Sequence, residues 1–277
     1  MLHQAHSIQD DVRPGAERSG MYFPRLKGKK LGIVANQTSL IGKTHLVDSL
    51  AALGRQMVSI RKLFGPEHGF SSFVGLHEVP VVYGMTIGEY ARMINREGWL
   101  GRGLACYLTV IPCEHYSHRS RYILPVPPSP NLPTMNSIFL YPCVCFFEGT
   151  VISEGRGTNS PFEVFGHPEL QAGDYSFTPE SIPGADSHPK LIGKLCRGKD
   201  LRYLSKIVDR QPGLNLSWLI YAYNNFPDKD NFFTPFFDKL AGTARLRHQI
   251  IEGLSEEEIR TSWADDLASF KKSAANT

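Results

Sequence analysis

An acid and an imidazole are adjacent in this chain: Glu67 and His68 occupy the turn Gly-Pro-Glu-His-Gly at residues 65–69. The apolar, β-branched run at residues 57–64 predicts a buried strand that ends at this turn. Ligands of open α/β sheets bind beyond the carboxyl ends of the strands. Glu67 and His68 are therefore candidates for acid–base chemistry. The alternative is a turn that carries two solvated polar side chains.

A strand, a helix and a second strand lead up to this turn. Residues 31–35 form a short apolar run that predicts a buried strand, and residues 36–39 follow as a polar loop. Apolar side chains at helical spacing predict a helix over residues 44–53, with Gly54 as its stop. The strand at residues 57–64 comes next. This order, with short connections, is the beginning of a doubly wound, parallel α/β unit.

The rest of the chain divides near a proline-rich segment. We expect an amphipathic helix from residue 85 to residue 98 and a further strand at residues 108–112. The prolines of residues 127–133 predict a rigid, extended connector. We therefore place a domain boundary there, which gives one domain at residues 1–125 and another at residues 126–277.

The second domain mixes short apolar runs with glycine-rich turns, which predicts an α+β fold. A strand that holds Cys143 and Cys145 would place both on one face, as ordinary apolar packing. The end of the chain is expected to be helical. Residues 217–225 carry apolar side chains at helical spacing, and Ser255 with Glu258 matches a capping box.

Composition excludes several classes of protein. The chain has 277 residues and a formal charge of +3, which is too small to argue for nucleic acid or an anionic membrane as a partner. No segment approaches the roughly 20 apolar residues of a membrane-spanning helix. The predicted strands end in neither a Gly-x-Gly-x-x-Gly turn nor a P-loop, so we expect no nucleotide cofactor.

The cysteines and the first residues bear on the compartment. Five scattered cysteines fit reduced core thiols best, which favours the cytoplasm. Residues 1–16 are polar, so no secretory signal is visible there. The run Cys113-x-His115-x-x-His118 fits no standard zinc pattern, and we expect no metal site.

Several short stretches, in order along the chain, resemble the signatures of one known family. They lie at residues 34–38, 63–69, 72–75, 84–89, 108–112, 128–133, 147–150 and 153–158. The family is the NamZ/YbbC-type exo-β-N-acetylmuramidases. The resemblance implies a Rossmann-like parallel-sheet domain, then an α+β domain, with the active site in the cleft between them. It also implies release of N-acetylmuramic acid from non-reducing ends of peptidoglycan fragments, outside the cytoplasm and without a metal or organic cofactor.

Glycoside hydrolysis needs a proton donor at the leaving oxygen and usually a second carboxylate. We assign the general acid–base role to Glu67, with a pKa raised by partial burial, and expect His68 to orient it or to contact the sugar. The second group stays open between Glu148 and Glu154, and Glu163 follows closely. Either of the first two can instead tie down adjacent backbone N–H groups.

Arg156 suits the lactyl carboxylate of muramic acid, because a guanidinium is always charged and can donate two parallel hydrogen bonds to a carboxylate. Otherwise Arg156 braces its Gly-Arg-Gly loop. The remaining candidates for sugar binding are polar residues that suit hydroxyl and acetamido groups: Asn36, Gln37, Tyr83, Asn131 and Thr158. Asn131, which lies between prolines, can instead be only a turn former.

The chain departs from the family pattern directly after Phe70. The family carries a long segment, with further strands and sugar-contacting loops, between the Gly-Pro-Glu-His-Gly turn and the stretch at residues 72–75. Here Ser71 follows Phe70. Loss of central strands exposes apolar faces and unpaired edges, so we expect an incomplete N-terminal sheet. Three outcomes stay open: a weakened exo-muramidase, a glycan-binding relative without catalysis, and an inactive remnant. The oligomeric state is also open.

Overall fold

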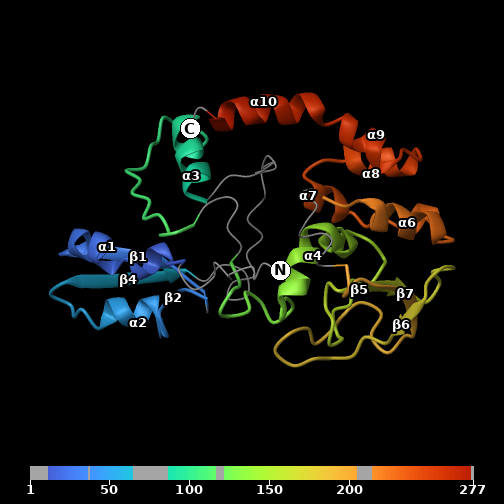
Figure 1. Cartoon of the computed structure of the whole chain (residues 1–277), viewed down its shortest axis with the longest axis horizontal. Coiled ribbons are helices and arrows are strands. Elements are labelled where there is room, and N and C mark those ends of the chain that lie inside the picture. The colour runs from blue at the N-terminus through green and yellow to red at the C-terminus, as the bar shows by residue number, and fades with distance from the viewer. Residues whose placement is uncertain (1–11, 37, 65–86, 117–121, 205–213, 276–277) are drawn as a thin grey trace, which may run out of the picture. The chain divides into compact units, whose positions relative to one another are not determined.

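The structure, a computed structural model, describes residues 12–36, 38–64, 87–116, 122–204 and 214–275. These residues divide into two compact units (Figure 1). The first unit comprises the described residues up to 126 together with those from 271 onward, and the second comprises those from 127 to 270. The domain boundary expected between residues 125 and 126 stays a prediction, because compactness alone does not establish independent folding.

A pair of parallel strands forms the centre of the first unit. β1 (Lys29–Val34) and β4 (Val58–Phe64) pair in parallel, with Lys29 opposite Val58. α1 (Ser19–Leu26) and α2 (Leu46–Ala51) lie on opposite sides of this pair (Figure 1). The expected strand–helix–strand order is confirmed. The described residues of this unit contain only these two parallel strands, so the Rossmann-like assignment stays a prediction.

A small hairpin shortens the predicted helix at residues 44–53. β2 (Leu40–Ile41) pairs with β3 (Thr44–His45), so α2 begins only at Leu46. The His45 side chain caps α2 by accepting a hydrogen bond from the Val47 amide at 3.3 Å. The unit also contains the short 3-10 helix η2 (Gly15–Glu17) and α3 (Ile87–Arg96). The expected stops after α2 and α3 are confirmed, since Gly54 and Gly98 both have positive φ.

Two expectations for the first unit are wrong. Residues 108–112 form no strand, because they make no ladder with any described strand. Neither β1 nor β4 is the buried strand expected at its position: in β1 only Ile33 is buried and Val34 is 69% exposed, and in β4 only Val58 is buried and Phe64 is 50% exposed. Among the described residues β1 and β4 pair only with each other, so the outer edge of each strand carries no further strand.

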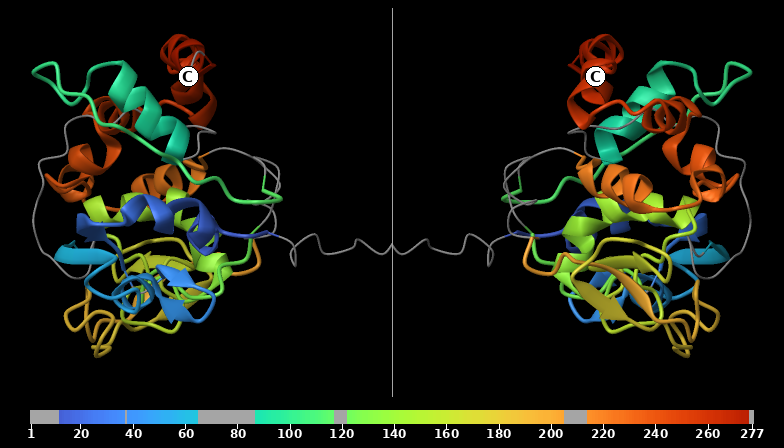
Figure 2. Two further views of the ribbon diagram at one scale, coloured as in Figure 1. Left: turned by 90° about the vertical axis from the view of Figure 1, so that its left-hand side faces the viewer. Right: turned by 90° about the vertical axis from the view of Figure 1, so that its right-hand side faces the viewer.

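The second unit combines helices with an antiparallel sheet, in which β7 (Cys196–Asp200) lies between β5 (Val164–His167) and β6 (Tyr175–Phe177). Helices α4, α6 and α7 lie on one side of this sheet (Figures 1 and 2). The fold of the chain is therefore mixed α/β. The helical elements are α4 (Met135–Val144), η3 (Cys145–Gly149), α6 (Ser217–Asn225), η4 (Lys229–Asn231), α7 (Phe237–Ala241), α8 (Arg245–Ile251), α9 (Glu256–Thr261) and α10 (Ala264–Ala275), which begins in this unit.

The hydrophobic core of the second unit joins its helices to its sheet. Leu140 of α4, Leu219 of α6 and Phe237 of α7 are fully buried in one cluster with Phe165 of β5. The ring of Phe147, in η3, stacks on that of Phe165 with centroids 4.6 Å apart. This contact holds η3 against the sheet, and Glu148 is the next residue of η3.

The expected strand at Cys143 and Cys145 is wrong, because this apolar stretch is helical. α4 begins with a capping box in which the Ser137 amide donates to Thr134 Oγ1 at 3.0 Å. The helix is apolar on nearly all sides, although only Ser137, Leu140, Cys143 and Val144 are buried. Cys143 lies buried near its end, and Cys145 follows in η3.

All five cysteines are free thiols, but they do not all lie in the core. Cys143 and Cys196 are buried and Cys145 is partly so, whereas Cys106 and Cys113 are exposed. The expectation of core thiols is therefore wrong for the last two. Burial raises the pKa of Cys145 to about 12 and that of Cys196 to about 11.

The predictions for the C-terminal helices are confirmed. α6 spans residues 217–225 as expected, and the capping box of Ser255 with Glu258 opens α9.

The connector at residues 127–133 is not extended throughout, because the Leu132 amide donates to the Ser129 carbonyl at 2.9 Å and closes a tight turn. None of the helices in the described ranges has the length and hydropathy to span a membrane.

Candidate active site

Glu148 lies on η3, whose backbone is held from two sides. The amide and the hydroxyl of Thr150 both donate to the Phe147 carbonyl, each at 2.9 Å. On the other side Gly149 packs against α7, so closely that a Cβ atom there would lie 2.5 Å from the Phe237 Cα. The Glu148 side chain therefore projects from a fixed turn.

A Gly-Arg-Gly turn presents Arg156 to Glu148. Gly155 and Gly157 have φ of +81° and +79°, a region that side chains disfavour. Space is also missing, because a Cβ would lie 2.7 Å from Val164 Cγ2 at Gly155 and 2.5 Å from Pro189 Cγ at Gly157. Both glycines are thus required for this turn, which fixes the start of the Arg156 side chain.

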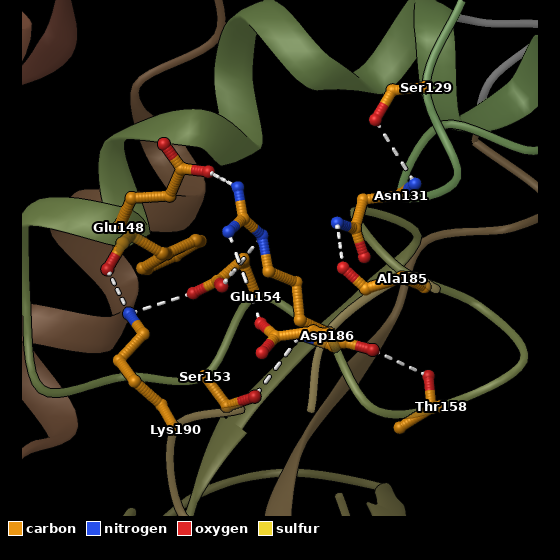
Figure 3. Close-up of polar contacts among 12 residues, drawn as sticks. Ser129, Asn131, Glu148, Ser153, Glu154, Thr158, Ala185, Asp186 and Lys190 are labelled. Atoms are coloured by element: carbon orange, nitrogen blue, oxygen red, sulfur yellow. Dashed lines mark hydrogen bonds and ion pairs between the residues drawn. The ribbon is translucent and has the colours of Figure 1, made fainter. Parts of the chain in front are cut away.

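Arg156 lies among the carboxylates of Glu148, Glu154 and Asp186, which Figure 3 labels. Its Nη2 donates to Glu148 Oε1 in a short contact, its Nε is 3.5 Å from Glu154 Oε1, and its Nη1 is 4.0 Å from Asp186 Oδ2. The guanidinium carbon also lies 5.2 Å from the ring centroid of Phe162, a cation–π contact. The charge of Arg156 is therefore shared among groups of the protein itself.

Lys190 provides the second cation of this cluster. Its ammonium donates to the carbonyls of Phe147 at 2.7 Å, Thr150 at 3.3 Å and Ile152 at 2.7 Å. Lys190 Nζ is also 2.7 Å from Glu154 Oε2. An ammonium has only three N–H donors, and the carbonyls take all of them. The contact with Glu154 is thus an ion pair, and Glu154 Oε2 accepts no well-oriented hydrogen bond from the described residues.

Burial is the largest influence on the pKa of Glu148. The side chain of Glu154 is only 3% exposed, whereas that of Glu148 is 15% exposed. Burial raises the pKa of Glu148 above its usual value, and the nearby Glu154 carboxylate adds to this, while Arg156 and Lys190 act in the opposite direction. Fully ionised, the cluster has three carboxylates and two cations. Glu148 is therefore the member best suited to exchange a proton.

Two further predicted residues lie at the edge of this cluster and bond to backbone. Asn131 Nδ2 donates to the Ala185 carbonyl at 3.1 Å, one residue before Asp186, and its amide donates to Ser129 Oγ at 3.2 Å (Figure 3). Thr158 Oγ1 donates to the Gly155 carbonyl at 2.7 Å. Asn131 thus ties its loop to that of Ala185, and Thr158 braces the Gly-Arg-Gly turn; the sugar-binding roles expected for both stay predictions.

The other candidates lie elsewhere. In the first unit, Asn36 Oδ1 accepts hydrogen bonds from the Thr38 amide at 3.1 Å and the Thr38 hydroxyl at 2.8 Å, which forms an Asx turn. Glu163 accepts a short hydrogen bond from the Thr134 hydroxyl at the start of α4. The remaining candidates lie outside the described residues, so their roles stay predictions: Gln37, Glu67, His68 and Tyr83.

Sequence reasoning missed Asp186 and Lys190. Both belong to the run Asp-Ser-His-Pro-Lys at residues 186–190, about thirty residues after the Gly-Arg-Gly turn. Charged residues beside a proline in a loop are usually solvated, so the run itself gave no signal for burial. In the part of the chain that the structure describes, no group of three or more His, Cys, Asp or Glu could hold a metal ion, and His118 of the dismissed run lies outside that part.

Comparison with known families places the chain near one group of proteins. Residues 139–277 match the family model "Exo-beta-N-acetylmuramidase NamZ, C-terminal", and residues 70–136 match "Exo-beta-N-acetylmuramidase NamZ, N-terminal". The chain is 36% identical over 221 residues to the peptidoglycan beta-N-acetylmuramidase NamZ of Bacillus subtilis strain 168. That match covers 74% of this chain and 52% of the relative, so the chain spans about half the length of the curated relative.

A solved structure has a similar fold. The crystal structure of a DUF1343 family protein from Bacteroides fragilis superimposes with a TM-score of 0.86 and 35% sequence identity. The superposition covers 96% of this chain and 98% of the other.

Proposed function

We propose that this chain, which belongs to the NamZ family of exo-beta-N-acetylmuramidases, is a glycoside hydrolase that releases N-acetylmuramic acid from non-reducing ends of peptidoglycan fragments. One observation carries the proposal: the C-terminal and N-terminal family models match in succession over residues 70–277. The carboxylate cluster of the second unit lies within the C-terminal match and supplies groups that glycoside hydrolysis uses.

Glu67 is the proposed general acid–base, and Glu148 is the proposed second carboxylate. Glu148 is favoured over Glu154 because its side chain is 15% exposed and its pKa is raised. Glu154 is almost fully buried and paired with Lys190, which suits a structural charge better than a reacting group. A carboxyl group with a raised pKa can give or take a proton near the working pH of an enzyme.

Arg156 is proposed to orient Glu148. Its contacts with Glu148, Glu154 and Asp186 occupy the guanidinium, and the lactyl carboxylate of muramic acid would have to displace one of them. A role in binding that carboxylate therefore remains the alternative proposal for Arg156, and it requires the ion pairs to open when substrate binds.

A chromogenic muramic acid glycoside tests the proposal. We expect wild-type protein to release the chromophore, and Glu67→Gln and Glu148→Gln to lower kcat by about 10²- to 10⁴-fold, the usual contribution of general acid–base catalysis. Glu257→Gln, at an exposed position of α9, is the matched control and should keep wild-type activity. Release by the wild type that does not exceed release by Glu67→Gln would contradict the proposal.

A glycan-binding protein without catalysis is the second candidate. It is favoured by the sequence after Phe70, where Ser71 follows directly and the long segment with sugar-contacting loops expected from the family resemblance is missing. Calorimetric titration with a muramic-acid-containing disaccharide separates the two candidates. Heat of binding without hydrolysis would support the binding protein. Absence of both, up to millimolar ligand, would leave the inactive remnant.

A further inference from the structure

Lys190 joins the backbone under Glu148 to the buried carboxylate of Glu154. Its three N–H groups are directed at carbonyls of residues 147, 150 and 152, which belong to the turn that carries Glu148. Its charge faces Glu154 Oε2 at 2.7 Å. Figure 3 shows Lys190 beside Glu154, and Arg156 Nε lies 3.5 Å from the other oxygen of that carboxylate.

Glu154 and Glu148 compete for Arg156. Arg156 Nη2 donates to Glu148, and Arg156 Nε is 3.5 Å from Glu154 Oε1 without making a hydrogen bond to the described residues. A buried carboxylate without a counter-charge is strongly unfavourable, so Glu154 would draw the guanidinium toward itself if Lys190 were lost. Glu148 would then lose its principal hydrogen-bond donor.

We propose that Lys190 is a positioning residue for Glu148, which acts by neutralising Glu154 so that the guanidinium of Arg156 stays on Glu148. Lys190 pairs with Glu154 and not with Glu148, so it acts mainly through Glu154, in addition to its direct attraction for the Glu148 carboxylate. Any benefit of this positioning for catalysis rests on the proposed function. The effect of Lys190 on the pKa of Glu148 is independent of that function, because the titration of the Glu148 carboxyl group can be measured directly.

The groups that face Glu148 determine what a titration should show. They are Arg156, Glu154 and Lys190, together with the Cys145 thiol on η3. The Cys145 thiol has a pKa of about 12, so it stays neutral over the pH range in which Glu148 titrates. Withdrawal of Arg156 removes the hydrogen bond that favours ionised Glu148. The pKa of Glu148 should therefore rise when Lys190 is replaced.

A double-mutant cycle with a carboxyl readout tests the proposal. Protein labelled with ¹³C at the glutamate carboxyl carbon is titrated by NMR, and the signal of Glu148 is the one absent from Glu148→Gln. We expect Lys190→Met to move this titration to higher pH. In a Glu154→Gln background the same Lys190→Met change should move it less, because a neutral amide at position 154 does not draw Arg156 away and only the direct attraction between Lys190 and Glu148 is lost. Equal shifts in both backgrounds, or none in either, would overturn the proposal.

Lys199→Met is the matched control. Lys199 is in the same unit and is paired with Asp174 at 3.3 Å, but no contact joins it to the cluster. It should leave the Glu148 titration unchanged. If Lys190→Met alone does not fold, the double variant decides: a folded Lys190→Met/Glu154→Gln protein supports neutralisation of Glu154 as the role of Lys190. An unfolded one shows that the carbonyl contacts are what matter and overturns the proposal.

Activity gives a separate readout. If wild-type protein hydrolyses the muramic acid glycoside, Lys190→Met should lower kcat on the order of tenfold, with the pH limb of kcat displaced upward and KM little changed. Glu154→Gln should cancel most of that displacement. An inactive wild type whose Glu148 titration still follows the cycle refutes the proposed function and leaves the positioning role intact.

Discussion

Glu148 combines a partly exposed carboxyl group with a buried charged neighbourhood. Arg156 and Lys190 provide the cations, but the three carboxylates of the cluster outnumber them. A group in such a place shifts its pKa rather than remain an unpaired charge. Because the folded and unfolded proteins then bind protons differently, the stability of the second unit must depend on pH.

The free energy of unfolding should fall as the pH rises from 4.5, the ordinary pKa of a glutamate, through the raised pKa of Glu148 in the folded protein. Below the unfolded-state pKa both states hold the proton and the contribution is complete; above the folded-state pKa it has been lost. Urea unfolding followed from pH 4 to pH 8 measures this slope. Glu148→Gln should flatten it, since glutamine does not titrate.

The matched control for this slope is Glu257→Gln, whose side chain is exposed at the start of α9. It should keep the wild-type dependence on pH. A slope that survives unchanged in Glu148→Gln would assign it to another group.

Among the elements, those with a complete local signal could be predicted from the sequence. α6 and α9 show helical spacing or a capping box, and β1 with β4 shows short apolar runs around a helix. Residues 108–112 have the composition of a strand, but pairing depends on a neighbouring strand that composition does not reveal. The same holds for the helix α4, whose apolar residues on all sides leave no helical period to detect.

The candidate site was predictable only in part, for a similar reason. Glu148 and Arg156 lie on turns whose glycines mark them in the sequence. Lys190 and Asp186 come from a distant loop, and only tertiary folding brings them to the cluster.

The capping box of α9 offers an element-scale prediction. Ser255 Oγ accepts from the Glu258 amide at 3.3 Å, and the Ser255 amide donates to Glu258 Oε2 at 2.8 Å. Ser255→Ala should destabilise the protein by about 1 kcal/mol, the usual cost of losing such a cap, as measured by urea unfolding. Ser255→Thr keeps the hydroxyl and should cost less. An equal loss in both variants would show that the cap does not carry this stability.

At the scale of the whole molecule, the two units differ in how much of their apolar surface is buried. The second unit has an extensive cluster that links helices to sheet. The buried apolar residues described in the first unit are Ile33, Leu50, Val58 and Met93. Hydrophobic burial is the main driving force of folding, so the second unit should be the more stable of the two.

A fragment of residues 127–275, which keeps α10 whole, should therefore fold alone. Differential scanning calorimetry should show one cooperative transition for the fragment, at the temperature of the main transition of the full chain. The corresponding fragment of residues 1–126 should melt over a broader range at lower temperature. A fragment of residues 127–275 without a cooperative transition would contradict the independence of the second core.

The ion pair between Lys190 and Glu154 also constrains how this chain can diverge from its ancestors. Loss of Lys190 leaves the buried Glu154 carboxylate without its nearest cation, which is unfavourable, whereas replacing both partners can be nearly neutral. The total stability of a domain is only about 5–15 kcal/mol, so a lineage that loses the lysine can rarely keep the glutamate. The two positions should accordingly be inherited as a pair and lost as a pair, while the exposed Glu257 of α9 changes independently.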